Sequence, residues 1–183
     1  MGNIALIGTH NSGKTTLFNW FKDYLKGQNY SFIEEQIRVI NRKGFGINES
    51  AGDESQLALA LSNSYQLLAN NKNIIADRFI LDNYIYAKYL NNKGVVSNKV
   101  VDLIESMIDV HLKFFDIFLY CNPFNDMVDD GIRSTDKYFQ LEIDKMFKDF
   151  IYKNKYMDGK TIILRGSTEE RIKFLVNREE LWK

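Results

Sequence analysis

One segment near the N-terminus constrains this chain more than any other. It reads Gly8-Thr9-His10-Asn11-Ser12-Gly13-Lys14-Thr15 and fills every fixed position of the pattern G-x-x-x-x-G-K-S/T. Residues 3–7 before it, apolar from Ile4 onward, predict a buried strand, and residues 13–26 after it predict a helix that stops at Gly27. Glycine permits backbone conformations that are closed to other residues, so successive N–H groups can turn inward around an anion at the start of the helix. The segment therefore predicts a phosphate-binding loop, or P-loop, rather than a simple connecting turn.

The side chains of this loop predict how a nucleotide is held. Lys14 can reach the outer phosphates, and the Thr15 hydroxyl can coordinate a magnesium ion that bridges them. His10 and Asn11 occupy variable positions of the pattern, and we expect their side chains to be solvated. The whole nucleotide site is expected to comprise Gly8, Thr9, His10, Asn11, Ser12, Gly13, Lys14, Thr15 and Thr16.

Short apolar segments that alternate with helical patterns predict the fold. The strands are expected at residues 3–7, 30–33, 73–76, 115–121 and 161–164. Helices are expected at 13–26, 34–43, 53–70, 81–90 and 98–112, with one after residue 135 and one after residue 167. Strands separated by helices pair in parallel through right-handed crossovers. We therefore expect an α/β fold, a three-layer P-loop NTPase sandwich with helices on both faces of a five-stranded sheet, as a single domain over residues 1–183.

Three of these helices carry signals about their packing or their start. The helix at 53–70 repeats apolar residues at helical spacing, which predicts that they face the core: Leu57, Leu61, Tyr65 and Leu68. The helix after residue 135 should be capped by Ser134 or Thr135 and should bury Phe139, Ile143, Phe147 and Phe150. The last helix begins with Ser167 and Glu170 at capping-box spacing.

Composition and charge limit the classes of function. Lysine plus arginine equals aspartate plus glutamate, 24 against 24, so the chain lacks the basic excess typical of proteins that bind nucleic acid, and a nucleic-acid partner is not expected. The single cysteine, Cys121, cannot form an internal disulfide, and no apolar run reaches the roughly 20 residues of a membrane span. We expect a soluble cytoplasmic protein without a membrane partner, and a homodimer is compatible with the sequence.

The pair Asp77-Arg78 follows the third predicted strand. In a P-loop sheet, a strand beside the P-loop strand usually presents an acidic residue near the bound metal. Asp77 could therefore organise magnesium beside Thr15, or take a proton from an attacking hydroxyl. Arg78 would offer a rigid donor fork to a phosphate oxygen. Alone, the pair could be a helix cap and a surface cation; the upstream P-loop favours the functional interpretation.

Taken together, these segments resemble the P-loop nucleoside and nucleotide kinases. This family of AAA-domain kinases includes thymidylate kinase, deoxynucleoside kinases and the ribosylnicotinamide kinase domain. The resemblance is carried by GTHNSGKTT at 8–16, EEQIR at 34–38, Gln56, ADRFILDNYIYAKY at 76–89 and DDGIRS at 129–134. It implies magnesium-dependent transfer of the ATP γ-phosphoryl group to a small nucleotide or nucleoside, with a deoxynucleoside monophosphate favoured. ATP and Mg²⁺ are the cofactors that it implies.

The same resemblance implies roles for individual residues. Arg78 and Asp82 match the segment that meets the acceptor, and a lid loop at about 122–135 carries Arg133, which would close over the transferring phosphoryl group. This lid is short and has one arginine. With Lys14 and Asp77, Arg133 would be catalytic, because phosphoryl transfer depends on alignment and on neutralising charge.

Three further residues are candidates for acceptor binding. If 34–43 is helical, Glu35 and Arg38 lie one turn apart and could contact sugar hydroxyls and a monophosphate, or they could form a surface ion pair. Gln56 could read a base edge, or it could be solvated.

Two other functions stay open at this point. The chain could be a P-loop ATPase switch or motor without a small acceptor, or a kinase that acts on modified bases in DNA. A guanine-specific switch is disfavoured, because residues 154–157 read N-K-Y-M and lack the aspartate of N-K-x-D.

Overall fold

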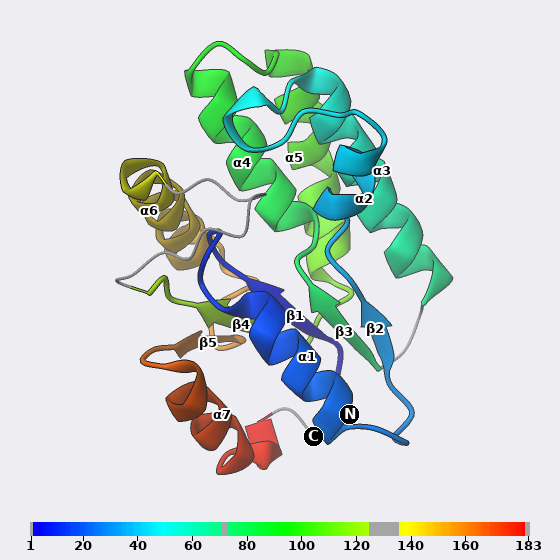
Figure 1. Cartoon of the computed structure of the whole chain (residues 1–183), viewed down its shortest axis with the longest axis vertical. Coiled ribbons are helices and arrows are strands. Elements are labelled where there is room, and N and C mark those ends of the chain that lie inside the picture. Colours follow the sequence, from blue (N-terminus) through cyan, green and yellow to red (C-terminus); the bar gives the residue numbers. More distant parts are fainter. Residues whose placement is uncertain (1, 71–72, 125–135, 182–183) are drawn as a thin grey trace.

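In the computed structural model, residues 2–70, 73–124 and 136–181 are described, and they form an α/β sandwich (Figure 1). The sheet is parallel, with strand order β2-β3-β1-β4-β5. Its strands are β1 Ile4–Ile7, β2 Ser31–Ile33, β3 Ile74–Asp77, β4 Ile117–Cys121 and β5 Thr161–Leu164. The predicted five-stranded parallel sheet is therefore confirmed, and β1, which leads into the P-loop, lies at its centre.

Helices cover both faces of this sheet (Figure 1). The described residues form α1 Lys14–Tyr24, α2 Ile37–Arg42, α3 Asp53–Ala69, α4 Ile80–Asn92, α5 Asn98–Leu112, α6 Lys137–Lys153 and α7 Thr168–Val176. Two short 3-10 turns, Asn48–Ser50 and Glu179–Leu181, complete the assignment. Helices α1 and α7 pack on one face, and helices α3 to α6 contribute to the core on the other. No helix in the described part of the chain is long and apolar enough to cross a membrane.

Alternation along the strands divides the core between the two faces. In β1, Ala5 and Ile7 belong to the cluster beneath α4, α5 and α6, whereas Ile4 and Leu6 belong to the cluster beneath α1 and α7. All four side chains are fully buried. Successive residues of a strand point to opposite faces, so a sheet covered on both sides needs an unbroken apolar run. The sequence of β1 supplies that run and places the loop after Ile7 at the carboxyl edge of the sheet.

The predicted core face of α3 is largely wrong. Leu61, Tyr65 and Leu68 are 67%, 70% and 74% exposed, and the buried residues of this helix include Gln56 and Ala60. Leu57 alone of the four predicted residues packs against the core. Helical spacing identified a stripe of the helix, but it did not identify the side that meets the protein.

The predicted N-terminal cap is wrong for α6 and confirmed for α7. Helix α6 is capped by Asp136, whose carboxylate accepts from the backbone N–H of Tyr138 (2.8 Å) and Phe139 (3.2 Å), so the cap is not Ser134 or Thr135. The expected apolar face of α6 is confirmed: Phe139, Ile143 and Phe147 are buried and Phe150 is partly buried. The capping box of Ser167 and Glu170 at the start of α7 is present as predicted.

Candidate nucleotide and acceptor site

The P-loop joins β1 to α1, and three of its residues have positive φ angles, which glycine and asparagine adopt more readily than other residues. Gly8 and Gly13 have φ angles of 132° and 79°, and Asn11 between them has a φ of 52°. A Cβ on Gly8 would lie 2.8 Å from the carbonyl oxygen of Cys121, so this position requires glycine. Left-handed residues within such a loop turn successive N–H groups toward one concave side. The geometry is that of an anion-binding nest at the N-terminus of α1.

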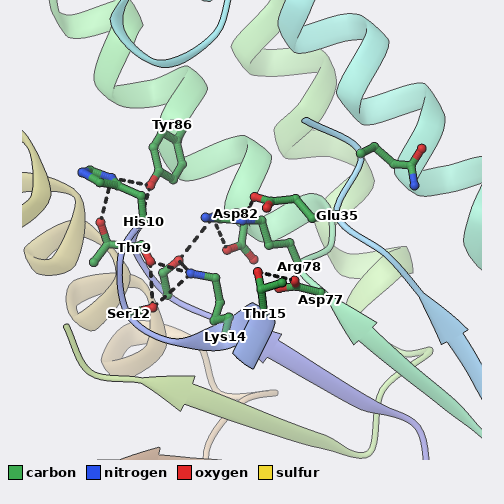
Figure 2. A network of polar contacts seen from close by, with 12 residues as sticks. Thr9, His10, Ser12, Lys14, Thr15, Glu35, Asp77, Arg78, Asp82 and Tyr86 are labelled. Atoms are coloured by element: carbon green, nitrogen blue, oxygen red, sulfur yellow. Dashed lines mark hydrogen bonds and ion pairs between the residues drawn. The ribbon is translucent and has the colours of Figure 1, made fainter. Parts of the chain in front are cut away.

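Lys14 lies folded into this nest (Figure 2). Its Nζ donates to the carbonyl oxygens of Gly8 (2.8 Å) and Thr9 and to the hydroxyl of Ser12 (3.1 Å). Burial, and then the positive charge of Arg78, lower the pKa of Lys14 from 10.5 to about 7. The hydrogen-bond acceptors of this ammonium group are neutral oxygens, and a bound phosphate would offer it a negatively charged one.

Thr15 and Asp77 meet at the first turn of α1. The Thr15 hydroxyl donates to Oδ2 of Asp77 (2.8 Å), and Oδ1 of Asp77 is buried with no hydrogen-bond partner among the described residues. Burial, and then the negative charge of Glu35, raise the pKa of Asp77 above its ordinary value. A hydroxyl and a carboxylate beside a phosphate nest fit Mg²⁺, which takes few protein oxygens and completes its shell with phosphate and water. The described residues contain no cluster of three or more acidic, histidine or cysteine ligands that could hold a metal without phosphate.

Arg78 is held between two carboxylates (Figure 2). It forms ion pairs with Glu35 and with Asp82, the latter at 3.0 Å, and its Nη1 also donates to the Gly8 carbonyl (3.3 Å). Its backbone is left-handed, with a φ of 76°, and its N–H donates to Leu6. Burial lowers the pKa of Arg78, but Glu35 and the other nearby negative groups raise it by more. The pKa is therefore raised overall, and the guanidinium stays charged.

The carboxylate partners of Arg78 correct one expectation. Glu35 precedes α2, which begins at Ile37, so Glu35 and Arg38 are not one helical turn apart and Glu35 faces Arg78 instead. Arg38 is exposed. Burial raises the pKa of Asp82 to about 6, against the opposing effect of Arg78.

A pocket opens beside this network. At one wall, Nδ2 of Asn83 donates to Oε1 of Gln56 (2.5 Å), while Oδ1 of Asn83 is buried and unpartnered among the described residues. Arg38 does not line it. Its walls are His10, Glu35, Gln36, Ile37, Gly46, Ile47, Asn48, Ala51, Gln56, Leu59, Asn63, Arg78, Phe79, Asp82, Asn83 and Tyr86. The structure therefore brings Glu35, Gln56, Arg78 and Asp82 together at one pocket and places Arg38 elsewhere.

His10 is not solvated as the sequence suggested. It is buried; its backbone N–H donates to the Tyr86 hydroxyl (2.8 Å), and its ring Nδ1 lies 2.9 Å from the same oxygen. The ring also packs against Phe139 at 5.0 Å between centroids. Tyr86 in turn lies against the Arg78 guanidinium at 5.7 Å. His10 therefore joins the P-loop to the wall of the pocket and to α6.

Arg171 was missed by the sequence analysis. It lies on α7, is 1% exposed, and contacts the P-loop from outside. A second hollow next to it is lined by Asn122, Pro123, Phe124, Gly166, Ser167, Thr168, Glu169 and Arg171. The predicted lid residue Arg133, and the lid beyond residue 124, lie outside the described residues.

Fold and site together define the class: this is a P-loop NTPase-like α/β protein. The sequence matches the AAA domain family over residues 3–171, and the chain belongs to that family. Among curated proteins, none matches this sequence.

Two kinds of solved structure are similar in fold. A deoxyadenosine kinase from M. mycoides with products dCMP and dCDP bound has a TM-score of 0.72 at 19% identity, with 97% of this chain and 98% of that chain covered. The NadR protein in complex with NR has a TM-score of 0.63 at 17% identity, with 90% of this chain covered. This chain spans about half of NadR, 46% of its length.

Proposed function

We propose that this chain transfers the γ-phosphoryl group of ATP, with Mg²⁺, to a hydroxyl group of a neutral nucleoside. The observation that carries the proposal is the neutralised state of Arg78 in the acceptor pocket. The charged side chains that line this pocket in the described part of the chain are Glu35, Asp82 and Arg78, two carboxylates against one guanidinium. Such a pocket repels a dianionic monophosphate and accepts a neutral sugar and base.

The nucleoside replaces the deoxynucleoside monophosphate that the sequence first favoured. That preference depended on Arg78 and Arg38 as partners for an acceptor phosphate. Arg78 is paired with two carboxylates, and Arg38 is exposed outside the pocket wall. The structures of similar fold support a nucleoside acceptor, because they are described as a deoxyadenosine kinase and as NadR with NR bound.

The site residues divide the chemistry between donor and acceptor. Lys14 and the N–H groups of the P-loop would bind the outer phosphates of ATP. Thr15 and Asp77 would hold the magnesium ion, which supplies positive charge to the transferring group. Of the two roles left open for Asp77, its bond to Thr15 supports the metal role. Arg133 keeps its proposed role over the transferring phosphoryl group.

Glu35 would take the proton from the attacking hydroxyl. It lines the acceptor pocket, and Arg78 fixes its carboxylate. A carboxylate held beside the acceptor hydroxyl favours the nucleophilic form as the bond to phosphorus forms. The base of the nucleoside would meet Gln56 and Asn83, whose amide pair leaves the Asn83 oxygen available for an N–H donor.

A panel of acceptors tests this assignment. Nucleosides and their 5′-monophosphates are compared at equal concentration for ADP formation with Mg-ATP, and ³¹P NMR identifies the product. We expect at least one nucleoside to support turnover and its monophosphate to support far less. The 5′-deoxy analogue of that nucleoside should inhibit without being phosphorylated.

A variant on α3 links the panel to the pocket. Gln56→Leu should raise the Michaelis constant for the nucleoside by about tenfold or more and leave that for ATP nearly unchanged, because buried amide bonds to a base are lost. Gln66→Leu, on the same helix but outside the pocket wall, is the matched control. Preference for monophosphates would overturn the nucleoside assignment. ATP consumption that no acceptor stimulates would favour the ATPase instead.

A further inference from the structure

Arg171 is a buried cation whose partners are backbone carbonyls. Its Nη1 donates to Ser12 (2.6 Å), its Nη2 to Asn122 (2.6 Å) and its Nε to Gly166 (3.0 Å), and its guanidinium lies 4.4 Å from the Phe124 ring centroid. No carboxylate pairs with it in the described part of the chain, and burial lowers its pKa against an opposing effect of Cys121. An arginine stays protonated even so, and a buried charge without a counter-charge is costly.

The bond to Ser12 orients a peptide group of the P-loop. In a trans peptide the C=O of one residue and the N–H of the next point in opposite directions. Arg171 holds the Ser12 carbonyl toward α7, on the outside of the loop, so the N–H of Gly13 is turned to the other side. The left-handed φ of Gly13, 79°, is compatible with that orientation.

A second outer contact repeats this geometry. Nε2 of Gln140, a fully buried residue of α6, donates to the carbonyl of His10 (2.8 Å). The same peptide relation turns the N–H of Asn11 away from Gln140. Two side chains, from helices far from the P-loop in sequence, thus hold alternate carbonyls of the loop from outside.

We propose that Arg171 and Gln140 are positioning residues that aim the N–H groups of Gly13 and Asn11 at the phosphates of the donor. Arg171 also adds a fixed positive charge behind the loop. A neutral donor could hold a carbonyl at lower desolvation cost, so the charge is explained if a polyanion compensates it. The proposal deepens the proposed function and rests on its nucleotide-binding part alone, because it requires neither an acceptor nor a particular base.

Magnesium triphosphate is the probe, since it carries the phosphates without base or sugar. Calorimetry measures its dissociation constant, and ¹⁵N–¹H NMR follows the amides of Gly13 and Asn11 through the titration. In the wild type both amide protons should move downfield as they bond to phosphate. Arg171→Met should weaken binding by at least about tenfold, as expected when oriented donors and a nearby charge are lost. It should abolish most of the Gly13 shift and keep most of the Asn11 shift. Gln140→Met should show the reverse pattern.

Two further variants separate charge, geometry and stability. Arg165→Met removes an exposed arginine just before the loop that Arg171 contacts, and its dissociation constant should match the wild type. Arg171→Lys keeps the charge but loses the fork, so it should restore affinity only in part. Circular dichroism and thermal melting show which variants are folded.

The amide shifts distinguish positioning from a purely structural role. A folded Arg171→Met protein that binds triphosphate normally and shows the wild-type Gly13 shift would overturn the proposal. If Arg171→Met fails to fold, the Arg171→Lys and Gln140→Met spectra decide it, and wild-type shifts in both would refute it. A wild-type protein that does not bind triphosphate would instead refute the proposed function, and the positioning role with it.

Discussion

Binding of a nucleotide to this protein should draw up to one proton from solvent onto Lys14, depending on the pH. This lysine is buried among carbonyls, and its pKa is lowered to about 7, chiefly by burial. Phosphate oxygens favour the charged form, so the bound lysine should regain a pKa at or above its ordinary 10.5. The proton taken up on binding is then the fraction of Lys14 that is neutral beforehand.

The size of this uptake follows from the two pKa values. With a pKa of about 7 before binding, roughly 0.9 of the lysines are neutral at pH 8, about half at pH 7 and roughly 0.1 at pH 6. Because the bound form stays protonated, uptake should be about 0.9 proton at pH 8 and about 0.5 at pH 7. The sign is fixed by linkage: affinity falls as pH rises above 7, approaching about tenfold per pH unit.

Isothermal titration calorimetry measures this number directly. A non-hydrolysable ATP analogue with magnesium is titrated at pH 8 in Tris and in HEPES, whose ionisation enthalpies differ. The slope of the observed enthalpy against the buffer enthalpy gives the protons taken up.

Lys14→Arg is the matched control, because an arginine is already charged before binding and should take up almost no proton. Subtracting the proton uptake of this variant from that of the wild type also removes any uptake by Asp82, Asp77 or the ligand. Uptake below about 0.3 proton at pH 8 in a wild type that binds, or equal uptake in a folded Lys14→Arg, would refute this account of the site.

Two further perturbations test the metal site and the core. Asp77→Asn should lower the catalytic rate by at least about a hundredfold and change ATP affinity far less, because it removes the proposed magnesium ligand. Steady-state kinetics measure both, and a normal catalytic rate would contradict the proposed role of Asp77. Phe147→Ala should lower the free energy of unfolding by about 3–5 kcal/mol in urea titrations, since this ring is fully buried. Tyr152→Ala, at a ring 92% exposed, should cost less than about 0.5 kcal/mol, and equal losses would contradict the assigned packing of α6.

Local patterns predicted the parts of this molecule that are themselves local. The P-loop motif lies within eight residues, and its strand and helix flank it, so motif and context together fixed the loop and its place in the sheet. The carboxyl ends of parallel strands meet at one edge, which brought Asp77 to Thr15 as expected. These inferences required no knowledge of which distant elements touch.

Inferences about which side of an element faces the protein were weaker. In α3, residues 55–69 contain no charged side chain, so nothing in the sequence marked one side as solvent-facing. Both stripes were open to burial, and the tertiary contacts chose Gln56 and Ala60 over Leu61 and Tyr65. The expected one-turn spacing of Glu35 and Arg38 was wrong for a related reason: the helix begins at Ile37, two residues after Glu35, and the Glu35 carboxylate faces Arg78 instead.

The supports of the P-loop come from the far end of the chain, and one of them left a signal. In α7 the buried residues are Arg171 and Leu175, four positions apart on one face of the helix. An arginine at an apolar position of an amphipathic helix has to find partners inside the protein, since burying it unpaired is expensive. In a P-loop, a peptide group whose N–H points inward turns its carbonyl outward, and such a carbonyl is a partner of matching chemistry for the arginine. A cation at a buried position of the helix after the last strand is therefore a physical reason to expect a contact with the phosphate loop. Gln140 on α6 is uncharged, and the sequence gives no comparable sign of its contact with the loop.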